Sequence, residues 1–202
     1  STSTDTQIVQ RINQKGPGAV FTPADFLDLG SRNAIDLALS RAARTGAIRK
    51  LARGLYDTPR VDPSIGPLAP ATDDVAHALR DRDGARLQPS GAHAAHLLGL
   101  SDQVPVRAVF LTDGRSRTVR LGRRQIVLKH TTPKQMATAG RVSGTAIQAL
   151  RWLGKSHVTP ELISALRRRL SDADRRQLVA DIRYAPAWIA DVFRAVADTG
   201  RP

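Results

Sequence analysis

The N-terminal part of the chain begins with apolar positions at helical spacing. Ile8 and Ile12 lie four residues apart, so both face the same side of a helix that is expected at about 5–14. Residues 22–25, with the sequence Thr-Pro-Ala-Asp, combine an N-cap residue, a proline at the first helical position and an acid at the third. This combination predicts a short second helix, which is anchored by Phe26.

A third helix is expected directly after the second. Gly30 ends the second helix, and Ser31 is a good N-cap for the next one. The apolar positions of the third helix form one stripe, which consists of Ile35, Ala38, Leu39 and Ala42. Two short helices that are joined by a turn of this length predict a helix-turn-helix.

An alternating segment follows the third helix, which Gly46 ends. Residues 48–56 alternate between apolar and basic positions, with a tight bend expected near 52–54. This pattern predicts two short strands that form a wing. The first domain is therefore expected to be a winged helix-turn-helix that spans 1–57.

Residues that break regular structure are concentrated in the next segment. Residues 58–72 contain Pro59, Pro63, Gly66, Pro67 and Pro70. Such a density of breakers predicts a linker over 58–72. The remainder of the chain, 73–202, is then expected to form a second domain.

The second domain mixes strand and helix patterns. Helices are expected at 73–82, at 90–100, after Thr132 and after Thr159, and the final helix has the apolar stripe Ile189, Val192, Phe193 and Val196. Short strands are expected at 106–112, 117–121 and 125–129, which predicts a small, largely antiparallel sheet. The expected fold class is α+β: a winged helix-turn-helix, then a mixed domain with this sheet and several C-terminal helices.

Composition narrows the function classes. No apolar run approaches the roughly 18 residues that a membrane-spanning helix needs. The polar start, Ser1–Gln10, does not have the pattern of a signal peptide. The absence of cysteine excludes disulfides and thiolate metal sites. We therefore expect a cytoplasmic protein without a membrane partner.

Charge is the strongest global signal. Lys and Arg number 31 against 18 Asp and Glu, which gives a formal net charge of +13. A strongly basic domain is typical of nucleic-acid binders. An acidic protein partner or an acidic membrane surface would be attracted by the same field, so charge alone leaves these alternatives open.

The third helix and the wing carry the candidate DNA contacts. Their exposed polar and basic side chains can reach base edges or phosphates. The candidate residues are Ser31, Arg32, Asn33, Asp36, Ser40, Arg41 and Arg44 of the helix and Arg49, Lys50 and Arg53 of the wing. Asp36 is expected either to accept a hydrogen bond from cytosine or to orient an arginine. The alternative is that these residues form only a solvated basic face.

A second basic cluster follows the expected strands of the second domain. It consists of Arg115, Arg117, Arg120, Arg123, Arg124 and Lys129. This patch is expected to contact DNA, RNA or an acidic protein surface. The alternative is a solvated strand face whose charges prevent edge pairing.

Catalytic and cofactor motifs are not found in the sequence. It contains no glycine-rich phosphate loop and no kinase-type catalytic loop. His93 and His96 share a helical face without a nearby carboxylate or cysteine, so packing is expected there rather than a metal. We assign no catalytic residue, no cofactor and no metal.

The residues of the third helix and the wing resemble those of AbiEi-like antitoxins, which belong to type IV abortive-infection toxin–antitoxin systems. The similarity is carried by 38–41 and 46–56 and extends more weakly to 90–92, 97–100 and 111–114. The resemblance implies a winged helix-turn-helix that represses its own operon at inverted repeats, with two copies bound together. It also implies a second domain that neutralises a nucleotidyltransferase-like toxin.

Two other functions remain open at this point. The protein could be an enzyme that inactivates the toxin covalently, for example by phosphoryl transfer assisted by Asp113 or another lone acid. It could also be an ordinary transcription regulator whose second domain senses a small ligand. The regulator hypothesis predicts an apolar pocket in the second domain, whereas the sequence there is rich in arginine.

Overall fold

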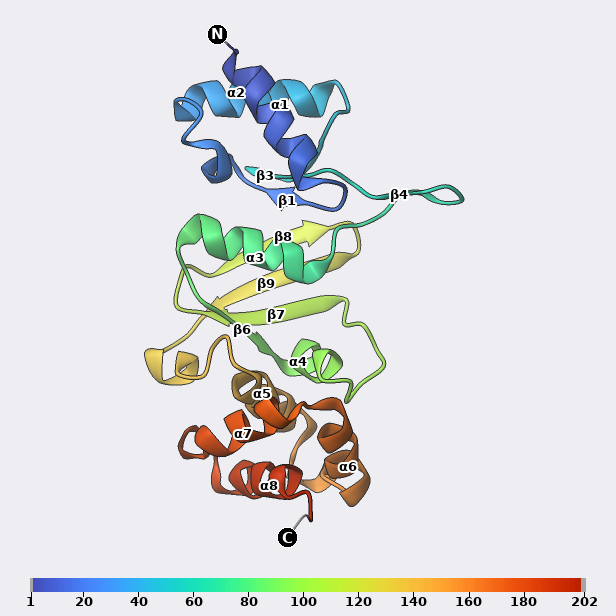
Figure 1. Ribbon diagram of the computed structural model, residues 1–202, viewed down its shortest axis with the longest axis vertical. Coiled ribbons are helices and arrows are strands. Elements are labelled where there is room, and N and C mark those ends of the chain that lie inside the picture. The colour runs from blue at the N-terminus through green and yellow to red at the C-terminus, as the bar shows by residue number, and fades with distance from the viewer. Residues whose placement is uncertain (1, 201–202) are drawn as a thin grey trace. The chain divides into compact units, whose positions relative to one another are not determined.

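The computed structural model, which describes residues 2–200, confirms the α+β class and divides the chain into two compact units (Figure 1). The first unit contains the residues up to Ala85 together with Val119–Gly122. The second contains Arg86–Thr118 and the residues from Arg123 onward.

The first unit begins with helices and short strands that alternate along the chain. The elements are α1 (Thr4–Lys15), β1 (Val20–Phe21), the 3-10 turn η1 (Pro23–Phe26), α2 (Arg32–Arg44), β2 (Arg49–Ala52) and β3 (Leu55–Asp57). The three strands form an antiparallel sheet in the order β1-β3-β2. The second of the three expected helices is thus a single 3-10 turn.

Apolar side chains from every one of these elements except β2 form the core of the first unit. All seven apolar positions predicted for the three helices are buried: Ile8, Ile12, Phe26, Ile35, Ala38, Leu39 and Ala42. Phe21 contacts the edge of the Phe26 ring, with centroids 5.7 Å apart, and stacks on Tyr56 at 6.4 Å. These contacts fix the sheet against the helices.

Local caps define where η1 and α2 begin. The backbone amide of Thr22 donates to Asp25 Oδ2 at 2.9 Å, as the predicted capping pattern requires. The hydroxyl of Ser31 accepts from the amide of Ala34 at 3.3 Å at the start of α2. Both predicted N-caps are therefore at the expected positions.

The expected linker contains regular structure. Strands β4 (Val61–Asp62) and β5 (Gly66–Pro67) form an antiparallel hairpin, which projects beside the β4 label in Figure 1. In its turn, Asp62 Oδ1 accepts the backbone amides of Ser64 at 2.7 Å and Ile65 at 3.1 Å. Four prolines therefore coexist with a hairpin, because a two-residue strand needs few backbone donors.

Helix α3 (Thr72–Asp83) lies in the first unit, whereas the sequence analysis assigned it to the second domain. It contacts β1 and buries Val75, Ala76 and Leu79. The compact unit therefore extends to Ala85 rather than ending before the breakers. The prolines and the glycine of 58–72 change the local structure, but α3, which follows them, still packs in the first unit.

The second unit contains the mixed sheet and the C-terminal helices. Its elements are β6 (Leu87–Ser90), α4 (Gly91–Leu97), β7 (Arg107–Thr112), β8 (Arg117–Leu121, of which Val119–Leu121 belong to the first unit), β9 (Arg124–His130), η2 (Pro133–Met136), α5 (Val142–Leu153), η3 (Lys155–His157), α6 (Pro160–Arg169), α7 (Asp172–Ala180), η4 (Ile182–Tyr184) and α8 (Ala187–Ala197). The sheet order is β6-β7-β9-β8.

The strand pairing differs from the expected antiparallel succession. Strand β6, which was not predicted, pairs antiparallel with β7, and β7 pairs in parallel with β9. The physical reason is that β7 and β9 are the most apolar strands and therefore occupy the centre. The arginine-rich β8 lies at the edge of the order, where charge is tolerated.

Helices α4 to α8 form the second core. Leu150, Leu166 and Phe193 are buried together in it, and α5 also contacts β6. The predicted stripe of the last helix, which consists of Ile189, Val192, Phe193 and Val196, is buried. The helix expected after Thr132 is only the turn η2, and the long helix α5 begins at Val142. None of the helices in residues 2–200 is both long enough and apolar enough to cross a bilayer.

Candidate nucleic-acid interface

The exposed face of α2 carries one stripe of side chains without internal partners. Asn33, Leu37, Ser40 and Arg44 follow the spacing i, i+4, i+7 and i+11, which places them on one line opposite the buried face. Within residues 2–200, none of the four side chains makes a hydrogen bond or an ion pair. We call these four residues the α2 stripe.

Leu37 is a member of this stripe that the sequence analysis missed. Its side chain is 54% exposed, although leucine is an apolar residue in a helix that has a well-filled core. Leucine is neither polar nor charged, so a prediction from polar and charged positions does not include it. The helical spacing from Asn33 to Arg44 was the signal that would have identified it.

Ion pairs flank the stripe on both sides. Arg32 Nε donates to the two carboxylate oxygens of Asp36 at 3.0 and 3.1 Å. Arg41 Nη1 donates to Asp5 Oδ2 at 3.0 Å, which connects α2 to α1. Asp36 thus orients an arginine, one of the two roles expected for it. These pairs are exposed and therefore weak, so a phosphate can replace the carboxylate.

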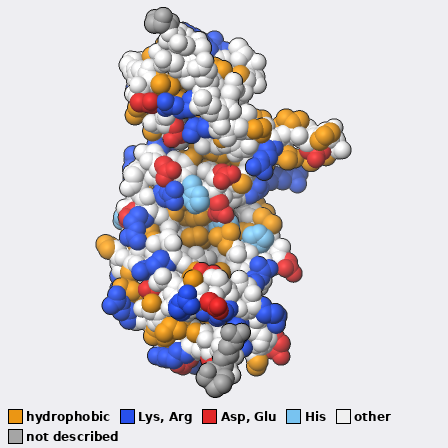
Figure 2. Space-filling model, viewed as in Figure 1, with side chains coloured by type: hydrophobic (Ala, Val, Ile, Leu, Met, Phe, Trp, Pro, Cys, Tyr) orange, Lys and Arg blue, Asp and Glu red, His pale blue; other side chains and the backbone are white. Residues whose placement is uncertain are grey.

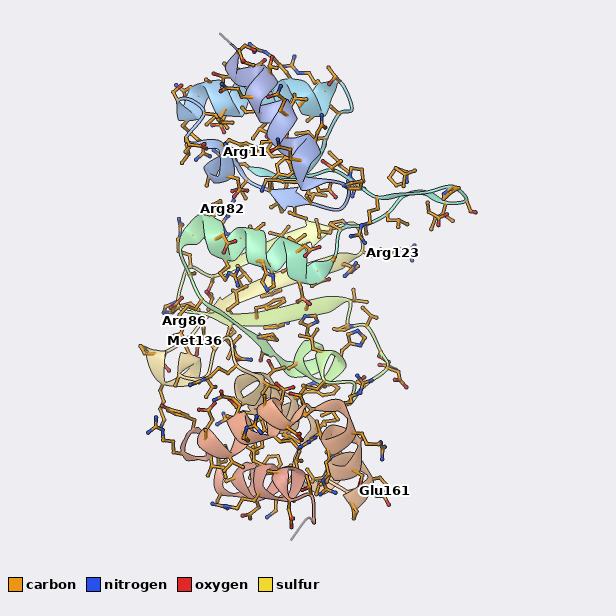
Figure 3. All side chains as sticks on the ribbon, viewed as in Figure 1. Arg11, Arg82, Arg86, Arg123, Met136 and Glu161 are labelled. Atoms are coloured by element: carbon orange, nitrogen blue, oxygen red, sulfur yellow. The ribbon has the colours of Figure 1, made fainter. Side chains whose placement is uncertain are left out.

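A network between α1 and η1 positions α2. Arg11, labelled in Figure 3, forms two parallel hydrogen bonds to Asp28, at 2.6 and 2.7 Å, and a third to the Asp25 carbonyl at 3.0 Å. The hydrogen bond from Arg11 lowers the pKa of the Asp28 carboxyl below its ordinary value, and it raises the pKa of Arg11. The turn that leads into α2 is thereby held against α1.

The β2–β3 hairpin places two basic residues at exposed positions. Lys50 lies on β2, and Arg53 lies in the turn between β2 and β3, where Gly54 has a φ of 68°. Neither the Lys50 nor the Arg53 side chain forms a hydrogen bond or an ion pair with any residue in 2–200. Both side chains are free to bind phosphate groups.

Arg49 has a different role from the one expected for the wing. Its guanidinium donates to both carboxylate oxygens of Asp57, at 2.9 and 2.7 Å, and to the Leu68 carbonyl at 2.8 Å. The Asp57 side chain is 1% exposed, and its hydrogen bond raises the pKa of Arg49 above the ordinary value. We therefore correct the assignment: Arg49 is a structural residue that joins β2, β3 and the segment after β5.

The sequence held a signal for this pair. Arg49 lies directly opposite Asp57 in the register of β2 and β3. The predicted domain ended at residue 57, but the predicted wing ended at Tyr56, so the acid was left out of the strand pairing. Likewise, Ser31 has a capping role, because its hydroxyl is used by the amide of Ala34.

The second basic cluster does not form one face. Residues three or five apart on a strand point to opposite sides, which separates Arg117 from Arg120 and Arg124 from Lys129. Arg120 also belongs to the first unit, whereas Arg115, Arg123 and Lys129 belong to the second. Figure 2 likewise shows Lys and Arg side chains at many separate places on the face it presents. These residues are not assigned to a single site.

The side chains considered for catalysis have structural partners. Asp113 Oδ1 accepts the backbone amide of Arg86, labelled in Figure 3, at 2.7 Å. His93 is buried against the Phe110 ring, with centroids 5.0 Å apart, and His96 Nδ1 lies 3.3 Å from the Ser101 carbonyl oxygen. In the described part of the chain, no group of three His, Asp or Glu residues is placed to hold a metal ion.

The fold therefore defines an α+β protein in which a helix with an unpaired stripe precedes a basic hairpin. The chain belongs to the family described as a family of unknown function, DUF6088, whose sequence profile matches residues 7–178. The match spans all of α2, the β2–β3 hairpin and the mixed sheet. A comparison with curated proteins finds no match.

Proposed function

We propose that this protein binds duplex DNA through a winged helix-turn-helix in its first unit, with α2 as the recognition helix. The element order α1-β1-η1-α2-β2-β3 and the sheet order β1-β3-β2 support the winged-helix interpretation. The observation that carries the proposal is the α2 stripe. Its polar side chains, which have no partner among residues 2–200, are available for an external one.

The chemistry of the stripe suits the major groove. An asparagine amide is complementary to the N6 and N7 edge of adenine, and an arginine guanidinium to O6 and N7 of guanine. Leu37 lies between Asn33 and Arg44, where an apolar side chain can contact the methyl group of thymine. One helix face thus offers three kinds of base contact.

The hairpin supplies contacts of another kind. Lys50 and Arg53 can bind phosphates, which fixes the position of the protein on DNA without selecting a sequence. The exposed pairs of Arg32 and Arg41 can open toward phosphates in the same way. The proposed interface therefore combines a base-reading helix with phosphate-binding flanks.

The test is a titration of the full-length protein against its own upstream DNA and a scrambled duplex at two salt concentrations. We expect a preference for the upstream DNA that persists at the higher salt. Arg44→Ala should reduce that preference. Arg194→Ala removes the same charge from an exposed ion pair on α8 and should leave the preference unchanged. Equal, salt-labile binding of both duplexes would exclude sequence-specific binding.

The resemblance to AbiEi-like antitoxins supports a more specific proposal, in which the DNA is the protein's own operator with inverted repeats. Two copies would bind it together in the cytoplasm, and the second unit would neutralise a nucleotidyltransferase-like toxin. Co-expression with the product of the adjacent gene tests this. Rescue of growth is expected, and an unchanged toxin mass would indicate binding or repression rather than covalent modification. Loss of rescue with DNA binding retained would leave an ordinary regulator.

A further inference from the structure

A recessed pocket of about 250 Å³ lies within the second unit. One wall comes from the segment around η2, with Thr132, Lys134 and Thr138, and the other comes from α5 with Arg151. Its polar and basic lining contrasts with the apolar pocket that a sensor of hydrophobic ligands would need.

The charge of the pocket is not compensated. Lys134 and Arg151 both line it, and neither side chain has a hydrogen bond or ion pair with the described residues 2–200. No acid is among the lining residues. Two cations that share a concave site repel each other, and a bound anion removes that repulsion.

Asp181, an acid close in sequence to Tyr184 of the pocket lining, already has hydrogen-bond and ion-pair partners. Asp181 is buried, accepts hydrogen bonds from Ser143 and, at 2.8 Å, from Gln177, and pairs with Arg141 at 3.4 Å. Its charge is therefore balanced by Arg141. It does not neutralise the two cations of the pocket.

Tyr184, which also lines the pocket, is held in place by two arginines. The guanidinium carbons of Arg183 and Arg141 lie 4.7 and 5.8 Å from the centre of its ring. Arg183 Nη2 donates to the Tyr184 hydroxyl at 2.8 Å. Because the hydroxyl oxygen accepts this bond, its hydrogen remains available to donate to a ligand.

A hydrogen bond also orients the side chain of Gln148, which lines the pocket. Its Oε1 accepts a hydrogen bond from Ser90 Oγ at 3.0 Å, which leaves its NH2 group as a donor. Ile147 of α5, which lines the pocket, is buried, and so is Met136 of η2, which is labelled in Figure 3. Two of the residues that line the pocket, Gln148 and Tyr184, therefore keep hydrogen-bond donors that no described residue uses.

We infer that this pocket binds a phosphate monoester, either as free phosphate or as the phosphate of a small nucleotide. A phosphate oxygen accepts from every donor described above, and an arginine fork matches two such oxygens. The volume equals about eight water molecules at roughly 30 Å³ each. It lies just below the range of about 300–1,000 Å³ for drug-sized ligands, so a phosphate with a small attachment fits. The convex backbone of a duplex does not enter a recess of this size.

The experiment is calorimetric titration of the full-length protein with inorganic phosphate, adenosine 5′-monophosphate and adenosine. We expect the two phosphate-bearing probes to bind with a Kd of about 1 mM or tighter, and adenosine not to bind. Binding of the monophosphate alone would identify a nucleotide as the ligand. Arg151→Gln and Lys134→Gln should each weaken binding by about tenfold or more. Arg168→Gln, an exposed arginine on α6 outside the pocket, is the matched control and should bind as the wild type does.

Three results would overturn the inference. The first is that neither phosphate nor the monophosphate binds. The second is that the Arg151→Gln, Lys134→Gln and Arg168→Gln variants bind these probes equally well. Alternatively, a scrambled DNA duplex would depend on Lys134 and Arg151 while the small probes do not bind. That last result would make the pocket part of a nucleic-acid surface instead.

Discussion

The α2 stripe and the β2–β3 hairpin both contain arginine, but their arginines differ in whether they have partners within the protein. Arg44 on the stripe has no internal partner in residues 2–200, whereas Arg49 on the hairpin makes three hydrogen bonds to Asp57 and Leu68. Both contribute equally to the net charge. The comparison shows that a basic sequence predicts an electrostatic field, while the internal partners decide which cations remain available to an external anion.

The largest expected effect tests the structural side of this comparison. Arg49→Ala leaves the buried Asp57 carboxylate unpaired, so the free energy of unfolding should fall by about 3–5 kcal/mol, nearer the lower end because Arg49 is 32% exposed. Urea unfolding followed by circular dichroism measures this loss. Arg53→Ala, which removes an unpaired arginine from the same hairpin, should unfold as the wild type does. Equal stability of the two variants would contradict the structural role of Arg49.

The next effect tests base recognition by the stripe. If the proposed DNA binding holds, Asn33→Ala should reduce discrimination at one base position by about 1–3 kcal/mol. Arg53→Ala should instead weaken binding to all sequences and reduce the salt slope by about 0.9 for the lost phosphate contact. Competition titrations with single-base operator variants distinguish the two patterns. An Asn33→Ala variant that loses affinity equally for operator and random DNA would place another element in the groove.

A smaller effect is expected at Leu37. Replacing the contacted thymine by uracil removes one methyl group, which should cost about 0.8 kcal/mol of binding free energy in the wild type. The same replacement should have no effect on Leu37→Ala, because the apolar partner is then absent. The measurement is a uracil scan across the operator with both proteins. An identical scan for the two proteins would exclude the methyl contact.

The smallest effect concerns the support of α2. The pKa of Asp28 is lowered by its hydrogen bond to Arg11, so this pair stabilises the fold above the ordinary carboxyl pKa. That contribution is lost as the pH falls through the lowered pKa. Asp28→Asn should therefore flatten the decline of Tm below about pH 4. Asp102→Asn removes an exposed carboxylate that has no ion pair with the described residues 2–200, and it should leave the decline unchanged. A wild-type decline in Asp28→Asn would show that the pair is not the cause.

Much of the first unit could be predicted from the sequence, because its signals are local. Helical spacing located Ile8, Ile35 and Leu39 in the core, and the capping residues Thr22 and Ser31 marked where η1 and α2 begin. The α2 stripe follows from the same periodicity, although only its polar members were identified.

What the sequence did not predict depends on contacts between distant residues. The parallel pairing of β7 with β9 depends on which strands are most apolar, and the packing of α3 depends on β1. Arg49 and Arg53 are the same type of residue and lie close together in the sequence. Only the register of β2 against β3 shows that Arg49 is opposite a buried acid.

The β4–β5 hairpin exposes apolar side chains that a protease can reach in the native protein. Ile65 in its turn is 76% exposed and Val61 is 67% exposed. Hydrogen bonds hold the chain on both sides of the hairpin. The amide of Gly18 donates to the Thr58 carbonyl at 2.6 Å, and Arg49 donates to the Leu68 carbonyl. A single cleavage at the hairpin turn should therefore leave two fragments that stay associated during gel filtration and separate only in denaturant.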